Sequence, residues 1–327
     1  MVLRQLQYLV ALAKYGHFGR AAEACLVSQP TLSAAIRQLE QELGTALVKR
    51  GHRFEGLTRD GEVVLQWSRR ILADCEAMRN ELDEQPEGIS GRLRISGVPS
   101  ALPVLPILTT QLAKRHPRAT IETLERAEED VLNELMAFET DVTLIYREMV
   151  AETKFHISRS LFKERYVLLT PIDGPLGDRE TATWEEASTI PLCLPSKHMR
   201  NRQIIDEFLH SGHERAVQIE ANSLMSLCAH VCSGDWSTIM PHAFLYPFGV
   251  PLGTKAVAIE GPKGSQELCL ATMQISPLPP LVRELFQIAD ETDMVREIRA
   301  ALGQPVDRPS SIRPPSCRPA AARRQPA

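Results

Sequence analysis

The spacing of apolar residues predicts three helices near the N-terminus. The first and third carry apolar stripes at helical spacing: Leu3, Leu6, Leu9 and Leu12, then Leu32, Ile36, Leu39 and Leu43. Between them, the small pair Ala21 and Ala22 allows a short helix to pack closely on its neighbours. Ser28 offers a side-chain oxygen as N-cap of the third helix, and Pro30 fits its first turn. The pattern indicates two short helices joined by a tight turn, with a supporting helix before them.

The outer face of the third predicted helix is polar and short-chained, with one arginine. It carries Thr31, Ser33, Ala34, Arg37, Gln38 and Gln41. A helix with a buried stripe and such an outer face can lie in the major groove of DNA, where its first turn reaches base edges and its amides face phosphate. The pair is therefore interpreted as a helix-turn-helix.

A basic segment follows this motif. Residues 46–58 read as two short strands around Gly51, with Lys49, Arg50 and Arg53 between or beside them. Through residue 59 the chain has eight basic and four acidic residues, a formal charge of +4, whereas the whole chain carries −4. A basic first segment in an acidic chain is typical of phosphate binding. The sequence predicts a basic wing.

A long charged helix is predicted next, capped by Thr58 and running to about Glu84. Its apolar stripe consists of Val64, Trp67, Ile71, Cys75, Met78 and Leu82. A solitary stripe on a long charged helix needs a covering surface, either its own domain or a second helix.

From Gly91 onward the pattern changes to short apolar runs that alternate with amphipathic helices. Strands near 93–98, 120–124 and 141–146 enclose helices near 101–116 and 129–139, which favours a parallel sheet with helices on both faces. An apolar segment at 161–170 has the density of buried strands. Later strands are expected near 190–194, 217–220, 237–240, 257–259 and 267–273, and helices near 184–187, 200–211, 222–232 and 281–302.

The last residues, 303–327, form a separate compositional block. They are rich in proline and hold five arginines against one aspartate, so they cannot build a core and are expected to be a disordered basic tail.

Composition places the rest among globular proteins, with 43% hydrophobic and 24% charged residues. No apolar run reaches a membrane span of about 20 residues, and no signal-peptide core opens the chain. A cytoplasmic protein without membrane contact is expected. The seven cysteines are scattered without a C-x-x-C pair, and are expected to be reduced.

A dense set of motif residues runs through the first 65 residues: Leu3–Leu6 with Tyr8, Phe18–Ala22, Val27–Ser33, Ile36–Glu40, Glu42–Gly44, Leu47, Arg50 and Leu57–Thr58. In these residues the chain resembles the winged helix-turn-helix of LysR-type transcriptional regulators. Val48 and Lys49 depart from the usual family residues. The resemblance implies that the major-groove contacts are Ser28, Gln29, Pro30, Thr31, Ser33, Arg37 and Gln38, and that Arg50 and Arg53 contact the backbone or minor groove.

The same resemblance implies the domain plan. It gives an N-terminal winged helix-turn-helix (mainly α) at 1–58, a long linker and dimerisation helix at 59–90, and an α/β two-lobed, periplasmic-binding-protein-like effector domain at 91–302. One lobe is expected at about 91–163 plus 268–302, and the other at about 164–267. The implied partners are double-stranded DNA with a split pseudo-palindromic operator, a second copy in a dimer or tetramer, and RNA polymerase.

The effector cleft is expected where strands end and helices begin. The candidate residues are Ser100, Ala101, Tyr146, His198, Arg200, Asn201, Arg202, Asn222 and Ser223. These hydroxyls, amides and cations suit a small anion. The stretches 195–202, 220–223 and 240–242 are similar to a subset of LysR-type regulators found beside formate dehydrogenase genes, which implies a small carboxylate co-inducer such as formate. No cofactor or metal is expected.

Other functions compete with this interpretation. The chain lacks H-E-x-x-H, G-x-S-x-G, a Walker loop and G-x-G-x-x-G, so an enzyme is not expected. His230 lies between Cys228 and Cys232, which leaves a cysteine-based redox-sensing or metal-sensing regulator open. A small-solute-binding protein without regulatory role and a dimerising scaffold are further alternatives, although neither explains the basic head.

Overall fold

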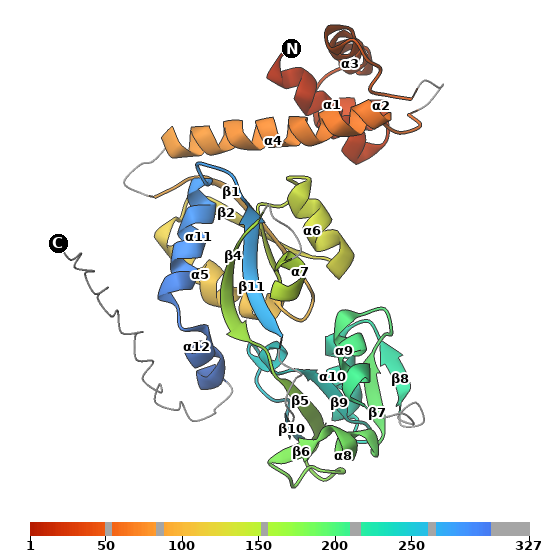
Figure 1. The fold of residues 1–327 in the computed structure, drawn as a ribbon, viewed down its shortest axis with the longest axis vertical. Coiled ribbons are helices and arrows are strands. Elements are labelled where there is room, and N and C mark those ends of the chain that lie inside the picture. The colour runs from red at the N-terminus through yellow and green to blue at the C-terminus, as the bar shows by residue number, and fades with distance from the viewer. Residues whose placement is uncertain (50–53, 83–87, 152–155, 210–216, 261–265, 302–327) are drawn as a thin grey trace, which may run out of the picture.

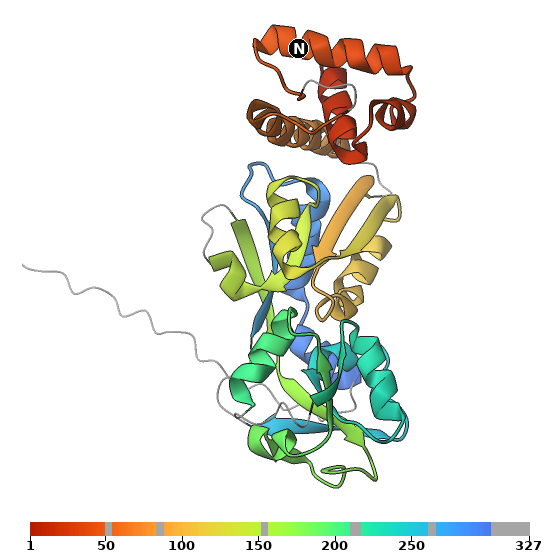
Figure 2. The same ribbon diagram turned by 90° about the vertical axis from the view of Figure 1, so that its right-hand side faces the viewer.

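The computed structural model describes residues 1–49, 54–82, 88–151, 156–209, 217–260 and 266–301. Figures 1 and 2 show a helical head, a long helix α4 (Arg59–Leu82), and two α/β lobes that follow one another along the molecule. The predicted fold class is confirmed: a helix-turn-helix head, a linker helix and a two-lobed α/β domain. The predicted tail at 303–327 and the wing residues Arg50 and Arg53 lie outside the described residues.

The head consists of α1 (Leu3–Tyr15), α2 (Phe18–Ala24) and α3 (Gln29–Leu43). The predicted cap is present, because the backbone N–H of Thr31 donates to Ser28 Oγ at 3.3 Å. Most of the predicted stripe residues of α1 and α3 meet Ala21 and Ala22 in one core, whereas Leu3 and Leu43 at the ends of the stripes are exposed. Beyond α3, Val48 pairs with Leu57 as an antiparallel bridge at the base of the predicted wing.

Helix α4 begins where the sequence predicted, because Thr58 Oγ1 accepts a hydrogen bond from the Gly61 N–H at 2.9 Å. Gly61 is packed so tightly that a Cβ atom would lie 2.1 Å from the Leu47 carbonyl oxygen. The helix buries Gly61, Leu65 and Ser68, and Leu65 belongs to the core of the head. The predicted apolar stripe does not coincide with this buried side, because Trp67 is 57% exposed and Leu82 is 82% exposed. The chain's own domains therefore leave much of that stripe uncovered.

Lobe 1 is built on a five-stranded sheet of order β2-β1-β3-β11-β4. Its strands are β1 (Gly91–Gly97), β2 (Ala119–Glu125), β3 (Val142–Tyr146), β4 (His156–Lys163) and β11 (Glu267–Met273). The predicted parallel pairing is correct for β2, β1 and β3. It does not extend to β11, which runs antiparallel to both β3 and β4.

The helices of lobe 1 pack on this sheet. They are η1 (Leu102–Val104), α5 (Pro106–Arg115), α6 (Glu128–Met136), α7 (Arg147–Ala151), α11 (Pro280–Glu291) and α12 (Met294–Ala301). The ion pair between Arg69 and Glu139 connects α4 to this lobe.

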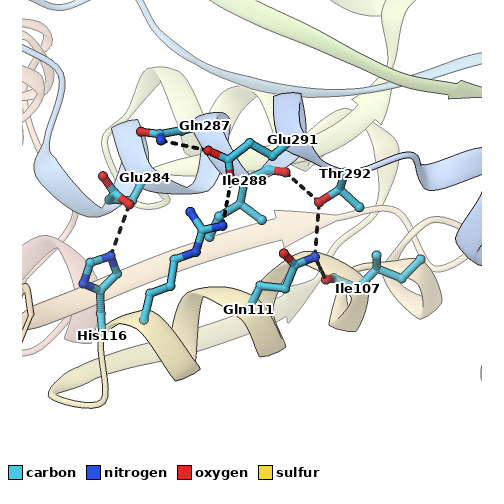
Figure 3. A network of polar contacts seen from close by, with 9 residues as sticks. Ile107, Gln111, His116, Glu284, Gln287, Ile288, Glu291 and Thr292 are labelled. Carbon is cyan, nitrogen blue, oxygen red and sulfur yellow. Dashed lines mark hydrogen bonds and ion pairs between the residues drawn. The ribbon is translucent and has the colours of Figure 1, made fainter.

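Figure 3 shows the polar contacts between α5 and α11. His116 Nε2 lies 3.3 Å from Glu284 Oε2, and Gln111 Nε2 donates to Thr292 Oγ1 at 3.1 Å. Thr292 has extended backbone angles and ends α11, so the single helix predicted at 281–302 is wrong and two helices occur. Apolar residues such as Met294 and Ile298 continue the pattern beyond the break, which concealed it.

Lobe 2 contains a four-stranded sheet of order β6-β10-β5-β9 and the parallel pair β7-β8. The strands are β5 (Tyr166–Pro171), β6 (Thr181–Thr183), β7 (Leu192–Pro195), β8 (Val217–Ala221), β9 (Thr238–Pro241) and β10 (Thr254–Glu260). The helices are α8 (Trp184–Ser188), α9 (Arg200–Phe208), α10 (Leu224–Cys232) and the 3₁₀ turn η3 (His242–Leu245).

The chain passes between the lobes twice. The apolar segment predicted at 161–170 divides into β4 and β5 at Glu164 and Arg165, and the return passage lies at Gln266. The two passages are joined, since the Glu164 N–H donates to the Gln266 carbonyl at 2.7 Å. Among the described helices, none combines the length and apolarity of a bilayer span.

Candidate DNA-binding and effector sites

The structure places the predicted base-reading residues on one accessible face of the head. Gln29, Thr31, Arg37 and Gln38 are exposed, and Ser33 is half-buried beside them. Ser28 and Pro30, both exposed, lie at the N-terminal end of the same helix. Gln38 Nε2 donates to Glu42 Oε1 at 3.2 Å, so this amide is held along the helix. Leu32, Ile36 and Leu39 anchor the opposite face in the core, which leaves the polar face free for DNA.

A cleft of about 250 Å³ lies between the lobes. It is lined by Val98, Pro99, Ser100, Glu125, Arg126, Ala127, Glu128, Tyr146, His198, Met199, Arg200, Asn201 and Asn222. These residues follow β1 and β2, end β3, or follow β7 and β8, so the carboxyl ends of strands from both lobes meet there. Of the predicted effector residues, Ser100, Tyr146, His198, Arg200, Asn201 and Asn222 are brought together.

Three predicted effector residues are not among those that line the cleft. Ala101 is fully buried in the core of lobe 1. Ser223 caps α10 by accepting a hydrogen bond from the Ser226 N–H at 3.4 Å. Arg202 is the third, and its Nε and Nη1 atoms are bonded within lobe 2.

Arg202 is only 2% exposed. Its Nε donates to Asp206 Oδ1 at 2.7 Å, and its Nη1 donates to Glu220 Oε1 and to the Pro195 carbonyl, both at 3.0 Å. These bonds tie α9 to β7 and β8. The effector contact predicted for Arg202 is therefore corrected to a structural contact. Helical periodicity put Arg200 and Arg202 on different faces, but their charge alone did not distinguish their roles.

A buried polar cluster forms the floor of the cleft at the passage between lobes. The Tyr146 hydroxyl lies 3.0 Å from Ser100 Oγ, 2.8 Å from Glu164 Oε2 and 3.2 Å from Asn201 Oδ1. The Tyr166 hydroxyl donates to the same Asn201 oxygen at 3.2 Å. Burial raises the pKa of Glu164 to about 8, and burial followed by the Glu164 charge raises the pKa of Tyr146 well above its ordinary value. Sequence reasoning missed Glu164, because one glutamate between two apolar strands carries no periodic signal.

The rim of the cleft bears charges of both signs. Arg126 Nε lies 2.5 Å from Glu134 Oε1, so this cation is partly neutralised. Burial raises the pKa of Glu128, and the positive charge of Arg200 opposes that shift. Sequence reasoning missed this β2–α6 loop, although β2 is the strand next to β1 and its carboxyl end had to meet the same edge.

Two helix N-termini border the cleft without side-chain caps. Helix α6 begins after Ala127 and helix α9 begins after Met199, and neither residue caps its helix through a side chain. The first backbone N–H groups of a helix lack intrahelical partners and attract anions. The two lobes thus each present a helix start and an arginine to the same space.

The described cysteines lie outside the cleft, and among them Cys232 is exposed. Cys193 and Cys228 are buried in lobe 2, and burial raises the pKa of both thiols to about 11. Cys269 is buried in lobe 1, with its pKa raised by burial to about 12. Among the described residues, no group of three or more His, Cys, Asp or Glu side chains is arranged to hold a metal. The lining residues of the cleft include no cysteine.

A helix-turn-helix head joined by a long helix to a two-lobed domain with an interlobe cleft defines a DNA-binding regulator with an effector-binding domain. The family comparison agrees with this class. Residues 3–62 match the bacterial regulatory helix-turn-helix protein, lysR family, and residues 86–293 match the LysR substrate binding domain. The chain therefore belongs to the LysR family of transcriptional regulators.

The relatives are regulators of transcription, and several of them are named as activators of hydrogen peroxide-inducible genes. The DNA-binding transcriptional dual regulator OxyR of Escherichia coli strain K12 is 32% identical over 243 residues, covering 74% of this chain and 79% of the relative. A hydrogen peroxide-inducible genes activator of Haemophilus influenzae is 29% identical over 288 residues, covering 85% and 92%.

Solved structures show the same architecture. A full-length OxyR variant from Pseudomonas aeruginosa has a TM-score of 0.71 and 25% identity, covering 91% of this chain and 95% of that one. CbnR, solved as a complex with its target DNA, has a TM-score of 0.60 and 20% identity, covering 89% and 99%. The second likeness bears on the fold alone.

Proposed function

We propose that this protein regulates transcription by binding DNA as a dimer and by binding a small carboxylate in the interlobe cleft. The observation that carries the effector proposal is the pairing of two uncapped helix starts, α6 and α9, across one cleft. A carboxylate between them accepts backbone N–H groups from both lobes, and Arg200 neutralises its charge. Formate is the smallest such ligand, and the cleft volume also admits longer carboxylates with water.

Glu128 opposes such a ligand. It lines the same cleft, and its carboxyl interacts with Arg200. An entering carboxylate competes with Glu128 for that guanidinium. Arg200→Ala should therefore weaken carboxylate binding by at least about tenfold, since a charge-assisted hydrogen bond contributes about 1.5–3 kcal/mol. Glu128→Gln should strengthen it.

The test is whether Arg200→Ala lowers and Glu128→Gln raises the affinity for a carboxylate. The affinities are measured by titration calorimetry with formate, acetate, oxalate and succinate. Lys197→Ala is the matched control: Lys197 is an exposed cation in the same loop but does not line the cleft. If Lys197→Ala and Arg200→Ala weaken binding equally, the ligand responds only to the overall positive electrostatic potential of lobe 2. The proposed contact with Arg200 in the cleft is then wrong.

Dimerisation is supported by the uncovered stripe of α4. Trp67, Met78 and Leu82 are exposed on a helix whose other apolar side is already buried. Pairing two such helices covers the stripes and places two α3 helices on a split, pseudo-palindromic operator. Tetramer formation and contact with RNA polymerase remain predictions from the family resemblance.

The effector must favour one arrangement of the heads over another, because a ligand that binds both equally shifts nothing. The ion pair between Arg69 of α4 and Glu139 of lobe 1 provides a route from the lobes to the heads. DNase footprints with and without carboxylate test this. A ligand that binds the cleft while footprint length and DNA bend stay unchanged would contradict the proposal.

Thiol-based peroxide sensing is the second candidate, favoured by relatives that are named as activators of hydrogen peroxide-inducible genes. The burial of Cys193, Cys228 and Cys269 argues against these three thiols as the sensor, because thiolates react with peroxide and raised pKa values keep these thiols protonated. Cys232 is exposed, so a redox sensor in this chain would use that thiol. Free-thiol counting after hydrogen peroxide treatment separates the candidates. The carboxylate proposal expects DNA binding to be unaffected, whereas rapid disulfide formation with altered DNA binding would establish the redox alternative.

A further inference from the structure

In the polar cluster at the interlobe passage, one hydroxyl group lies within hydrogen-bond distance of two acceptor oxygens. The Tyr146 hydroxyl carries a single proton but contacts two acceptor atoms, Glu164 Oε2 at 2.8 Å and Asn201 Oδ1 at 3.2 Å. It cannot donate to both. Either Glu164 carries a proton and donates to Tyr146, which then donates to Asn201, or the Asn201 amide turns and donates to Tyr146. Asparagine oxygen and nitrogen are assigned from such networks rather than seen directly.

Burial favours the first arrangement at neutral pH. Glu164 is fully buried, and its second oxygen, Oε1, has no hydrogen-bond partner among the described residues. A carboxylate with one hydrogen bond in such a place is poorly stabilised, whereas a neutral carboxylic acid is satisfied by donating to Tyr146. Burial accordingly raises the pKa of Glu164 to about 8.

Asn201 connects this cluster to the cleft. It is 5% exposed and is also one of the lining residues. The hydroxyls of Tyr146 and Tyr166 contact its Oδ1, so the other end of the amide, Nδ2, is turned away from the tyrosines. Because Asn201 is also a lining residue of the cleft, this end of the amide can face a ligand there.

We propose that Glu164 is a positioning residue that acts through Tyr146 and sets which end of the Asn201 amide faces the cleft. With Glu164 protonated, Asn201 presents N–H donors that bind a carboxylate. With Glu164 ionised, Tyr146 donates to Glu164, the amide turns to donate to the tyrosines, and its carbonyl oxygen repels a carboxylate. This inference rests on the proposed function for the ligand class only.

Other charged groups around the cluster do not replace Glu164 in this role. The Tyr146 and Tyr166 hydroxyls face it from β3 and β5. Arg200 and Glu128 act on Tyr166 from the two sides of the cleft, and Glu207 acts from α9. Arg165 follows Glu164 in the chain, and its backbone N–H donates to His242 Nδ1 at 3.1 Å. Burial lowers the pKa of His242 to about 4, so this ring is neutral near pH 8. His198 lines the cleft and needs its own control.

The expected signature is a pH profile. Because the carboxylate binds the protonated form, its affinity is constant below the pKa of Glu164 and falls about tenfold for each pH unit above it. Between pH 7 and pH 9 the dissociation constant should therefore rise by about tenfold. Binding at pH 9 should take up close to one proton per ligand, measurable by calorimetry in buffers of different ionisation enthalpy.

Three variants isolate the effect. Glu164→Gln keeps an N–H that donates to Tyr146 but cannot ionise, so the pH dependence and the proton uptake should vanish while binding persists. Glu267→Gln removes a carboxylate from the adjacent strand β11, where Glu267 pairs with Arg147 at 3.1 Å, and should leave the profile unchanged. His198→Gln should also retain the profile. Circular dichroism verifies that each variant is folded. The proton uptake is measured on the wild type, so this part of the test does not depend on the folding of any variant.

A ligand-free measurement completes the test. In protein labelled with ¹⁵N asparagine, the side-chain NH₂ peaks of Asn201, identified by their loss in Asn201→Ala, should shift between pH 7 and pH 9 in the wild type but not in Glu164→Gln. Peaks that do not move in the wild type, or that move equally in Glu164→Gln, would overturn the inference. If the peaks move as expected but none of formate, acetate, oxalate and succinate binds at any pH, the Glu164 switch is supported and the carboxylate effector is refuted.

Discussion

Replacement of Arg202 by alanine should destabilise lobe 2 strongly. The guanidinium is 2% exposed and bonds to Asp206, Glu220 and the Pro195 carbonyl. Removing the two buried CH₂ groups that alanine lacks, Cγ and Cδ, costs about 1.6 kcal/mol at about 0.8 kcal/mol per CH₂. Leaving the Pro195 carbonyl without this partner costs about 1–3 kcal/mol. Asp206 and Glu220 are 34% and 39% exposed, so they rehydrate, and each ion pair contributes at most about 1 kcal/mol. The loss should total about 4 kcal/mol.

The assay is urea unfolding followed by tryptophan fluorescence. The chain has three tryptophans, and Trp184 and Trp236 lie in lobe 2. A Trp67→Phe background removes the signal of α4, so that fluorescence reports lobe 2 alone. With a urea slope of about 2 kcal/mol/M, the midpoint should fall by about 2 M.

Two further variants separate stability from binding. Arg202→Lys keeps a charge but loses the planar fork, and its midpoint should lie between wild type and alanine. Arg200→Ala should change the stability of lobe 2 by about 0.5 kcal/mol or less, yet weaken carboxylate binding. An Arg202→Ala protein with an unchanged midpoint and abolished ligand binding would refute the structural role argued for this residue.

Other expectations concern DNA and pH. Gln29→Ala should reduce discrimination between operator and unrelated DNA by about 1–3 kcal/mol in competition binding, because a side chain at the start of α3 reads base edges; equal loss on both DNAs would contradict this. Arg53→Ala should weaken binding evenly and reduce the slope of log K against log salt by about 1, whereas an intact slope would remove Arg53 from the phosphate contacts. The raised pKa of Glu164 stabilises the fold below the unfolded value of 4.5, and this stability is lost as pH rises towards about 8. The free energy of unfolding, measured by urea unfolding from pH 5 to pH 8, should therefore fall in the wild type by up to about 1.4 kcal/mol per pH unit, and less in Glu164→Gln.

Local sequence patterns were sufficient to predict the helices of the head. The stripe of α3, its Ser28 cap and its Pro30 start lie within one short segment, so sequence periodicity contained them. The structure has them, except that Leu43 at the end of the stripe is exposed. The break at Thr292 was invisible, because the apolar spacing continues and the contact that accompanies the break comes from Gln111, far away in the chain.

The site was only partly predictable for the same reason. Strand ends identified Ser100, His198 and Asn222, which do line the cleft. The role of Arg202 depends on Glu220 and Pro195, and that of Glu164 depends on Tyr146 and Asn201. Three of these contacts join residues 18 to 55 positions apart, and the fourth, from Arg202 to Pro195 seven positions away, depends on how α9 packs on β7. Composition and spacing therefore do not reveal them.

The central claim is that a carboxylate in the cleft changes how the heads engage DNA. The direct measurement is binding of the full-length protein to the DNA upstream of its own gene, across a salt series, with and without each carboxylate, and with DNase footprints. The account predicts tight, salt-dependent, sequence-selective binding and a footprint whose length changes with one carboxylate but not in Arg200→Ala. Weak binding that is indifferent to sequence, or a footprint that no bound carboxylate alters, would contradict it.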